Sequence, residues 1–334
     1  MMSFRLNRFS PLALAPALLL SVSLSACDAE LQDTPESMSL TARGATEVMP
    51  GDVLAIGMVD LQSIADNPLT TPFGEAGVFT RHLEGEARAR FDDFVSVTGL
   101  DPQEDLSEVY AAIEAEGSSE RVSLAIYGSF DREATEAYIN SRLGDALSRS
   151  DYAGVPVYSS TNDRGGIAFA LASDEMVVAS SNVEGVSAMI DRLQGNGESV
   201  ADNEALMRRI ARASSAGDVW GVALKPASVD APDGSSEVEN QLAQLWLAID
   251  AAGGGVDVRS DAMDTRLQFY PAEGVSTADL ASLLRGALAL ARAQEGMNDE
   301  QRALLDDAEI NAEGDFVSFQ VTAPNAVFEG IAKH

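Results

Sequence analysis

Histidine and cysteine, which supply most catalytic nucleophiles, general bases and zinc ligands, are scarce in this chain of 334 residues. The sequence contains two histidines, His82 and the terminal His334, and a single cysteine, Cys27. A zinc site needs several such ligands together, and a histidine-activated nucleophile would have to use His82. His82 lies in the charged segment FTRHLEGEARARF, which is typical of a solvated helix. We therefore predict neither a zinc site nor a histidine-dependent catalytic centre.

Carboxylates are abundant, with 53 aspartates and glutamates against 22 lysines and arginines. Acid and base catalysis needs two carboxylates that converge in a cleft, and neighbouring pairs in a sequence do not indicate this. The nearest approach to a calcium loop is Asp257, Asp261 and Asp264, which lacks the DxDxDG spacing and is expected to flank a hairpin turn. We predict no metal, no cofactor and no catalytic residue.

Glycine-rich phosphate loops are also missing from the pattern of the chain. The sequence contains no GxSxG, GxxxxGK[ST] or strand-following GxGxxG motif. Gly165-Gly166 precedes a predicted strand, and Gly253-Gly254-Gly255 lies between a predicted helix and a predicted strand. Because glycine commonly ends a helix, we interpret both groups as turns.

The first residues have the three parts of a secretory signal. Arg5 and Arg8 form a basic opening, residues 11–22 are apolar, and small residues precede Cys27. The apolar stretch is shorter than the roughly 20 residues of a membrane-spanning helix. The four residues Leu24, Ser25, Ala26 and Cys27 resemble the lipobox of bacterial lipoproteins, a resemblance that covers the targeting segment alone.

The lipobox resemblance implies export, removal of a signal peptide at residues 1–26 and attachment of diacylglycerol to the Cys27 sulfur. The bilayer is then a partner through the acylated Cys27, and the chain faces the periplasm. Asp28 resembles the signal that retains lipoproteins of enteric bacteria in the inner membrane. If that rule does not apply, we expect the outer membrane.

The polar, aperiodic segment at residues 27–49 is predicted to be a flexible tether. About 20 extended residues would reach some 70 Å from the bilayer.

The formal net charge of −31 excludes one class of partner. Such a surface repels the phosphates of nucleic acids and anionic lipid headgroups, so we predict no nucleic acid ligand. Only Lys225 and Lys333 are lysines. A saline habitat and a GC-rich genome account equally well for this composition.

Residues 50–216 are predicted to form a first α+β half. Strands are expected at 51–61, 122–130, 155–160, 166–173 and 175–181, the last two joined by a tight turn at Asp174-Glu175. Helices are expected from Asp131 to about Leu147 and from Asn182 to Leu193, each beginning with a capping side chain. We also predict a helical insertion from about Gly74 to Glu116.

Residues 217–334 are predicted to form a second half, which starts with GDV as the first half does. Its order of helix 238–251, strands 256–260 and 265–271, helix 276–293, strand 315–323 and helix 325–332 parallels the first. This order suggests a duplication, although any α+β protein can show it and few identities extend beyond GDV. The boundary lies either at Pro226–Glu237 or just before Gly217.

Strand pairs joined by short turns predict an α+β fold in which antiparallel sheets are covered by helices. The leading functional hypothesis is a membrane-anchored envelope lipoprotein that binds an unknown envelope protein or small ligand and is not an enzyme. The alternatives are a carboxylate-dependent periplasmic hydrolase, which predicts a pocket of acids with raised pKa, and a carrier of a lipid or hydrophobic ligand.

Overall fold

The computed structural model describes residues 35–65, 85–116, 119–144, 146–160, 166–226, 237–293 and 299–324. The described residues divide into two compact units, one formed by residues 35–224 and the other by residues 225–324. We call them the larger and the smaller unit. Each combines helices with strands that pair antiparallel to their neighbours, which confirms the predicted α+β class.

The larger unit is built on eight strands in the order β8-β1-β2-β3-β7-β6-β5-β4. The central hairpin of β2 and β3 pairs with β1 on one side and with β7 on the other. The strands are β1 (Val53–Asp60), β2 (Leu106–Glu116), β3 (Ser119–Gly128), β4 (Leu147–Tyr152), β5 (Val155–Ser160), β6 (Ala168–Leu171), β7 (Met176–Ser180) and β8 (Val219–Leu224).

Helices of the larger unit begin at residues whose side chains accept hydrogen bonds from the first turn. Ser39, Asn182 and Asn203 cap α1, α6 and α7 in this way. The helical segments are η3 (Pro35–Ser37), α1 (Leu40–Val48), α2 (Leu61–Ala65), α4 (Gly85–Thr98), α5 (Arg132–Tyr138), the π-helix η5 (Ile139–Leu143), α6 (Val183–Leu193), η6 (Val200–Asp202) and α7 (Glu204–Ser214).

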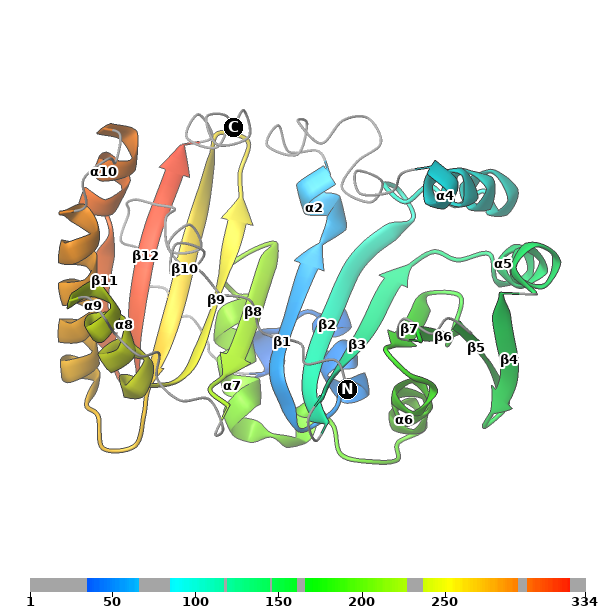
Figure 1. The fold of residues 1–334 in the computed structure, drawn as a ribbon, viewed down its shortest axis with the longest axis horizontal. Helices are drawn as coiled ribbons and strands as arrows, with labels where there is room; N and C mark the ends of the chain where they lie inside the picture. The colour runs from blue at the N-terminus through cyan, green and yellow to red at the C-terminus, as the bar shows by residue number, and fades with distance from the viewer. Residues whose placement is uncertain are drawn as a thin grey trace. The chain divides into compact units, whose positions relative to one another are not determined.

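The main core of the larger unit lies between one face of its sheet and helices α1, α6 and α7. Tyr110 and Trp220 contribute aromatic rings from β2 and β8, and Met189 and Ile210 contribute side chains from α6 and α7. A smaller cluster lies at the β4 to β7 end, where Ile139 of η5 packs with Tyr158 and Leu171. In Figure 1, α4 and α5 lie beside this end of the sheet.

The smaller unit contains four strands in the order β11-β12-β10-β9, and α9 packs its buried side chains Leu280 and Leu284 against Phe319 and its neighbours. Lys225 Nζ donates to the carbonyl oxygen of Trp246 (2.9 Å) near the carboxyl end of α8. The elements are α8 (Glu237–Ala248), β9 (Ile249–Val258), β10 (Ala262–Pro271), α9 (Thr277–Arg292), α10 (Asp299–Asp306), β11 (Glu309–Glu313) and β12 (Phe316–Pro324).

The predicted flexible tether is wrong for its second half. Ala42 and Ala45 of α1, and Met38 and Met49 just outside its two ends, are buried and belong to the main core. Their spacing of three to four residues is helical, but they are separated by polar residues and by Gly44, so the segment has no obvious apolar run.

The predicted helical insertion is wrong at residues 106–116, which form strand β2. This strand is rich in alanine and glutamate, which favour helices, but its pairing with β1 and β3 overrides that preference. The helix predicted for residues 131–147 ends early. Helix α5 gives way to η5, and Leu147 already begins β4.

The interpretation of Gly253-Gly254-Gly255 as a turn is wrong, because all three glycines lie within β9. A Cβ atom on Gly254 would lie 2.2 Å from the carbonyl oxygen of Arg266 on β10. The glycine therefore permits a close approach of two strands. Helix α8 accordingly stops at Ala248, three residues before the predicted end.

Several predictions are confirmed within the described ranges. The hairpin of β6 and β7, helix α6 with its Asn182 cap and helix α9 form as expected, and the structure adds that Ser276 caps α9. The start of the second half at Gly217 differs from the structure, because strand β8 pairs with β1 and belongs to the larger unit, which ends at Leu224. The duplication stays a prediction, and the helix at residues 325–332 lies outside the described residues. No helix in the described ranges is long and apolar enough to span a membrane.

Candidate functional site

The residues of the predicted lipidation site, Leu24, Ser25, Ala26, Cys27 and Asp28, precede the first described residue. His82 and His334 also lie outside the described ranges. The anchor therefore stays a prediction from the sequence, and any binding site must be sought on the two units.

The aspartates at the β9–β10 hairpin are engaged with neighbouring side chains. Asp257 and Asp264 lie opposite each other in the hairpin ladder. Asp264 accepts a hydrogen bond from the Thr322 hydroxyl and forms an ion pair with Arg259, with 2.7 Å between its Oδ2 and the arginine Nη2. Across the part of the chain that the structure describes, no three acidic, histidine or cysteine side chains are grouped to hold a metal ion.

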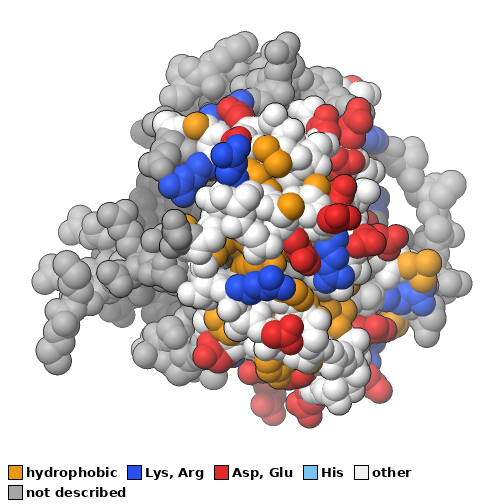
Figure 2. All heavy atoms as spheres, turned by 90° about the vertical axis from the view of Figure 1, so that its right-hand side faces the viewer, with side chains coloured by type: hydrophobic (Ala, Val, Ile, Leu, Met, Phe, Trp, Pro, Cys, Tyr) orange, Lys and Arg blue, Asp and Glu red, His pale blue; other side chains and the backbone are white. Residues whose placement is uncertain are grey.

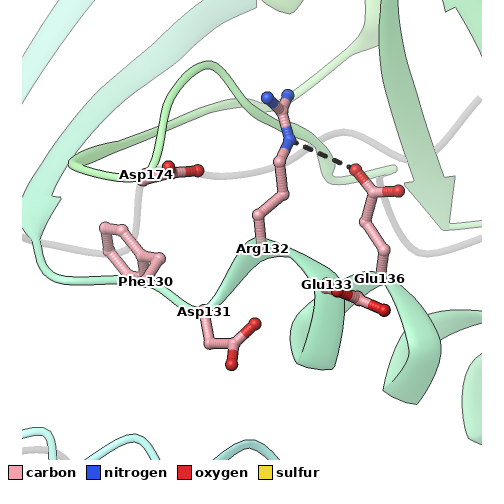
Figure 3. Close-up of a pocket in the computed structure, with 6 residues that line it drawn as sticks. All are labelled: Phe130, Asp131, Arg132, Glu133, Glu136 and Asp174. Carbon is pink, nitrogen blue, oxygen red and sulfur yellow. Dashed lines mark hydrogen bonds and ion pairs between the residues drawn. The ribbon is translucent and has the colours of Figure 1, made fainter.

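An open hollow of about 480 Å³ lies where β3 leads into α5, beside the turn between β6 and β7. Figure 3 shows Arg132 in this hollow with its guanidinium turned toward Glu136. Arg132 Nε lies 3.3 Å from Glu136 Oε1, and its Nη2 donates to the carbonyl oxygen of Leu171 (2.6 Å). The remaining lining residues are Phe130, Asp131, Glu133 and Asp174. The hollow is thus predominantly acidic, and its arginine is already bonded to the protein.

Surface charge around this end of the larger unit is mixed. Figure 2 looks onto the side where α5 and β4 lie, and it shows many acidic side chains with arginines between them and only small hydrophobic patches. Ion pairs such as Arg142 with Asp93 are exposed, with 3.6 Å between Nε and Oδ2. Exposed pairs of this kind contribute little to stability and are not a sign of a binding site.

A buried ion pair lies under the helices of the larger unit. Glu114 on β2 is 5% exposed, and its Oε1 lies 3.3 Å from Nε of Arg121 on β3 and accepts a hydrogen bond from the Ser123 hydroxyl (3.2 Å). Burial raises the pKa of Glu114, and the Arg121 charge opposes this shift. Burial also lowers the pKa of Arg192 on α6.

Sequence reasoning missed this cluster, because the segment that contains Glu114 was predicted to be helical and forms strand β2 instead. Because Glu114 is enclosed by protein, its role in the described structure is to bond β2 to β3.

The second face of the sheet in the larger unit is the most unusual feature. On each strand, alternate side chains point to opposite faces. In the register of β2, Tyr110, Ala112 and Glu114 point into the main core, so Val109, Ala111 and Ile113 point to the other side. We call that other side of five strands the aliphatic face. Its central part comprises Val219, Gly221, Ala223, Ala55, Gly57, Val59, Val109, Ala111, Ile113, Val122, Leu124, Ile126, Val177 and Ala179. Beyond Ile113 and Val122 the same side continues to Ala115 and to the charged Glu120, which pair at the end of the β2–β3 hairpin and which we do not count in the face.

All fourteen positions of the aliphatic face are glycine, alanine, valine, leucine or isoleucine. An antiparallel sheet with one face on a core usually presents polar side chains to water on the other face. Strands that are apolar on both faces are instead typical of a sheet that is covered on both sides. The fourteen positions therefore form an unusually apolar second face for a sheet of this kind.

Part of this side of the sheet is covered by the protein itself. At the β4 to β7 end, Tyr158, Leu171 and Val177 pack with Ile139 of η5. Within the described ranges, the other aliphatic-face residues belong to none of the three hydrophobic clusters. Most are half-buried, and Val122 is 39% exposed. The covered cluster thus continues into an apolar surface over β3, β2, β1 and β8 that is for the most part half-buried.

Comparison with known proteins gives no functional assignment. No protein family and no curated protein matches the chain. Two solved structures, "Structure of crystal form III of TP0453" and "Structure of crystal form I of TP0453", are similar to it with TM-scores of 0.48 and 0.46. Both are 14% identical in sequence, cover 86% of this chain, and are themselves covered to 98% and 96%.

Proposed function

We propose that the chain is an exported bacterial lipoprotein, anchored through Cys27, that binds an apolar ligand or partner without catalysis. The observation that carries the binding role is the aliphatic face, fourteen apolar positions on five strands. Apart from Val177, they belong to none of the hydrophobic clusters of the described residues. The hydrophobic effect makes such a surface costly to leave in water, and on other proteins exposed apolar patches mark sites of interaction.

Support for the anchor comes from the sequence. Cys27 is the only cysteine of the chain and follows Leu24, Ser25 and Ala26 in a lipobox pattern. If Asp28 acts as an inner-membrane retention signal, we expect the protein on the periplasmic side of the inner membrane. Otherwise, we expect it on the periplasmic side of the outer membrane. A single acyl chain holds a protein weakly, so durable anchoring requires the two or more chains that lipoprotein maturation supplies.

The start of the folded body limits how far it can stand from the bilayer. Met38 is 5% exposed and belongs to the main core of the larger unit. Only about ten residues then separate Cys27 from the core, and they span at most about 35 Å when extended. The larger unit is therefore held within reach of lipids and of other proteins of the same membrane.

The anchor is tested by metabolic labelling with a palmitate analogue, followed by membrane fractionation, in the native protein and in Cys27→Ala. We expect label and membrane association in the native protein and neither in the variant. Equal labelling of the two proteins, or of neither, would remove the anchor from the proposal.

The binding role is tested with single thiols on the two faces of one strand. A soluble form that starts at Asp28 omits Cys27 and has no cysteine, so Ala111→Cys and Ala112→Cys each introduce one reactive group. Ala112 is fully buried in the main core, whereas Ala111 lies on the aliphatic face. In the purified chain, we expect the Ala111→Cys thiol to react rapidly with maleimide and the Ala112→Cys thiol to react slowly.

In isolated envelopes, an occupant should protect the Ala111→Cys thiol relative to the purified chain. The proteins used in the envelope experiment keep Cys27, because acylation prevents its sulfur from reacting with maleimide. Equal reactivity in the two preparations would show that the face is empty in the envelope. Slow reaction of both variants in the purified chain would show that the face is covered by the protein itself. Either result would refute the binding role.

A further inference from the structure

We infer that the aliphatic face binds one acyl chain of a lipid whose headgroup carries no net negative charge. The inference rests on the proposed binding role and names the class of ligand. None of the fourteen side chains of the face has a hydrogen-bonding group, and none is aromatic. The centres of protein interfaces are instead enriched in tyrosine, tryptophan, methionine and arginine. Purely aliphatic side chains match a hydrocarbon chain better than they match a folded partner.

Main-chain hydrogen bonding gives no alternative means of recognition on this face. Strands β1, β2, β3 and β7 each have a paired neighbour on both sides. Their N–H and C=O groups are therefore used within the sheet, and an extended peptide laid across the face cannot add to the ladder. A ligand that needs no hydrogen bonds, such as an acyl chain, loses nothing by binding there.

The acidic residues at one end of the face indicate which charge the lipid headgroup can carry. At the end of β3 and β7, Phe130 N–H donates to the carbonyl oxygen of Asp174 (2.8 Å), at the acidic hollow. Asp131, Glu133, Glu136 and Asp174 line that hollow, and Arg132 is bonded to Glu136 and to the Leu171 carbonyl. A phosphate or carboxylate headgroup at this end of the strands would be repelled, whereas an uncharged one would not.

The same charge disfavours a second copy of the chain as the occupant. The formal net charge of −31 makes two copies repel each other as they approach. A bilayer surface is disfavoured by shape, because Ile139 of η5 covers the sheet at its β7 end and prevents flat contact along the whole face. A single chain can lie beside that covering helix.

The extent of the face agrees with one acyl chain. Five strands at a spacing of about 4.8 Å span about 19 Å from the first to the last. One leaflet of a bilayer, which has the length of one acyl chain, is about 15 Å thick. One chain can therefore lie across the five strands with both of its ends on apolar side chains.

The test measures displacement of the neutral fluorescent probe N-phenyl-1-naphthylamine from the purified soluble form without the anchor cysteine, residues 28–334. Monopalmitin supplies the acyl chain with an uncharged head, and palmitate supplies the same chain with an anionic head. Leu124→Asn changes the centre of the face, and Leu247→Asn is the matched control, because Leu247 is 58% exposed on α8 of the smaller unit. Ala111→Asn is a second variant of the face in case Leu124→Asn does not fold.

We expect monopalmitin to displace the probe in the native protein, and its affinity to fall at least tenfold in the folded face variant. The Leu247→Asn control should stay within twofold of the native affinity. Palmitate should bind at least fivefold more weakly than monopalmitin at low salt, and the gap should narrow as salt screens the carboxylate.

Three results would overturn the inference. The first is absence of displacement by both lipids although the Ala111→Cys thiol is reactive, which would leave the binding role intact and remove the lipid. The second is an equal loss of affinity in the face variant and the Leu247→Asn control. The third is sedimentation of the unanchored chain with phosphatidylcholine vesicles, or its dimerisation, when either is lost in the face variant, because the occupant would then be a bilayer or a second copy.

Discussion

Tyr110 on β2 and Tyr127 on β3 meet edge to face under α1, with 5.6 Å between their ring centroids, but their hydroxyl groups have different surroundings. The Tyr110 hydroxyl donates to Glu108 Oε2 (2.6 Å). The Tyr127 hydroxyl is buried below Gly44 and has no hydrogen-bond partner within the described ranges. Burial raises the pKa of Tyr127 to about 12. The two rings therefore make similar packing contacts. The bonded Tyr110 hydroxyl should stabilise the fold, whereas the buried Tyr127 hydroxyl should not.

Removing the two hydroxyl groups should change stability in opposite directions. Tyr110→Phe loses a charge-assisted hydrogen bond, and we expect the free energy of unfolding to fall by about 1–2 kcal/mol. Tyr127→Phe removes a buried donor without a partner, and we expect an unchanged value or a gain of up to about 1 kcal/mol. Urea unfolding of both variants at pH 7 measures the difference. A loss in Tyr127→Phe as large as that in Tyr110→Phe would mean that its hydroxyl is bonded in solution.

The two faces of β2 should also tolerate a larger side chain differently. Ala112 is fully buried, so Ala112→Thr adds a hydroxyl to a packed core, and we expect it to lower the free energy of unfolding by about 2–3 kcal/mol. Ala111→Thr places a residue that favours strands on the aliphatic face, and we expect a change within about 0.5 kcal/mol. Equal losses in thermal unfolding would show that both faces are packed.

The fold class could be predicted because most long-range pairing is between strands that are neighbours in the sequence. The hairpin of β6 and β7 has strong apolar runs and a short polar turn, and α6 has both a capping Asn182 and an apolar stripe. Strand β2 was missed because Tyr110, Ala112 and Glu114 face the core while Val109, Ala111 and Ile113 face the other side. No alternation of apolar and polar residues marks it, and its alanines and glutamates favour a helix.

The aliphatic face itself could not be predicted from the sequence. Its residues come from five strands and lie up to 168 positions apart in the sequence, from Ala55 to Ala223, and only the register of β1 with β2 and β8 places Gly57 beside Ala111 and Gly221. Apolar runs in the sequence indicated buried strands, but they could not show which face the helices cover. That information belongs to the three-dimensional arrangement of α1, α6 and α7.

Gly254 should tolerate no side chain, because β9 and β10 approach each other closely at this position. A Cβ atom there would lie 2.2 Å from the Arg266 oxygen, so Gly254→Ala must separate β9 from β10, and we expect a loss of more than about 2 kcal/mol. Gly221→Ala on β8 is the control, because its Cβ would lie 3.5 Å from the nearest atom, the Ile56 oxygen. We expect the control to be neutral or slightly stabilising in thermal unfolding. An equally mild effect of Gly254→Ala would mean that the strands separate at little cost.

The buried Glu114 should make the stability of the larger unit depend on pH in an unusual direction. Its pKa is raised in the folded state from 4.5, chiefly by burial, so the folded protein holds this proton to a higher pH than the unfolded chain does. The contribution of Glu114 is then fully present below pH 4.5 and declines as pH rises through the folded pKa. Most buried carboxylates with strong partners have a lowered pKa, so their contribution to stability is lost as pH falls, not as it rises.

Glutamine does not titrate, so the Glu114→Gln variant should lack this decline in stability with rising pH. The free energy of unfolding of the variant minus that of the native protein should therefore rise from pH 4.5 upward and then level off. Ser123→Ala keeps the carboxylate but removes its hydrogen bond, which holds the pKa down, so the native decline should extend to higher pH in this second variant. Urea unfolding at several pH values between 4 and 8 measures both effects. A difference between Glu114→Gln and the native protein that stays constant over this range would show that the Arg121 charge fully offsets the cost of burial.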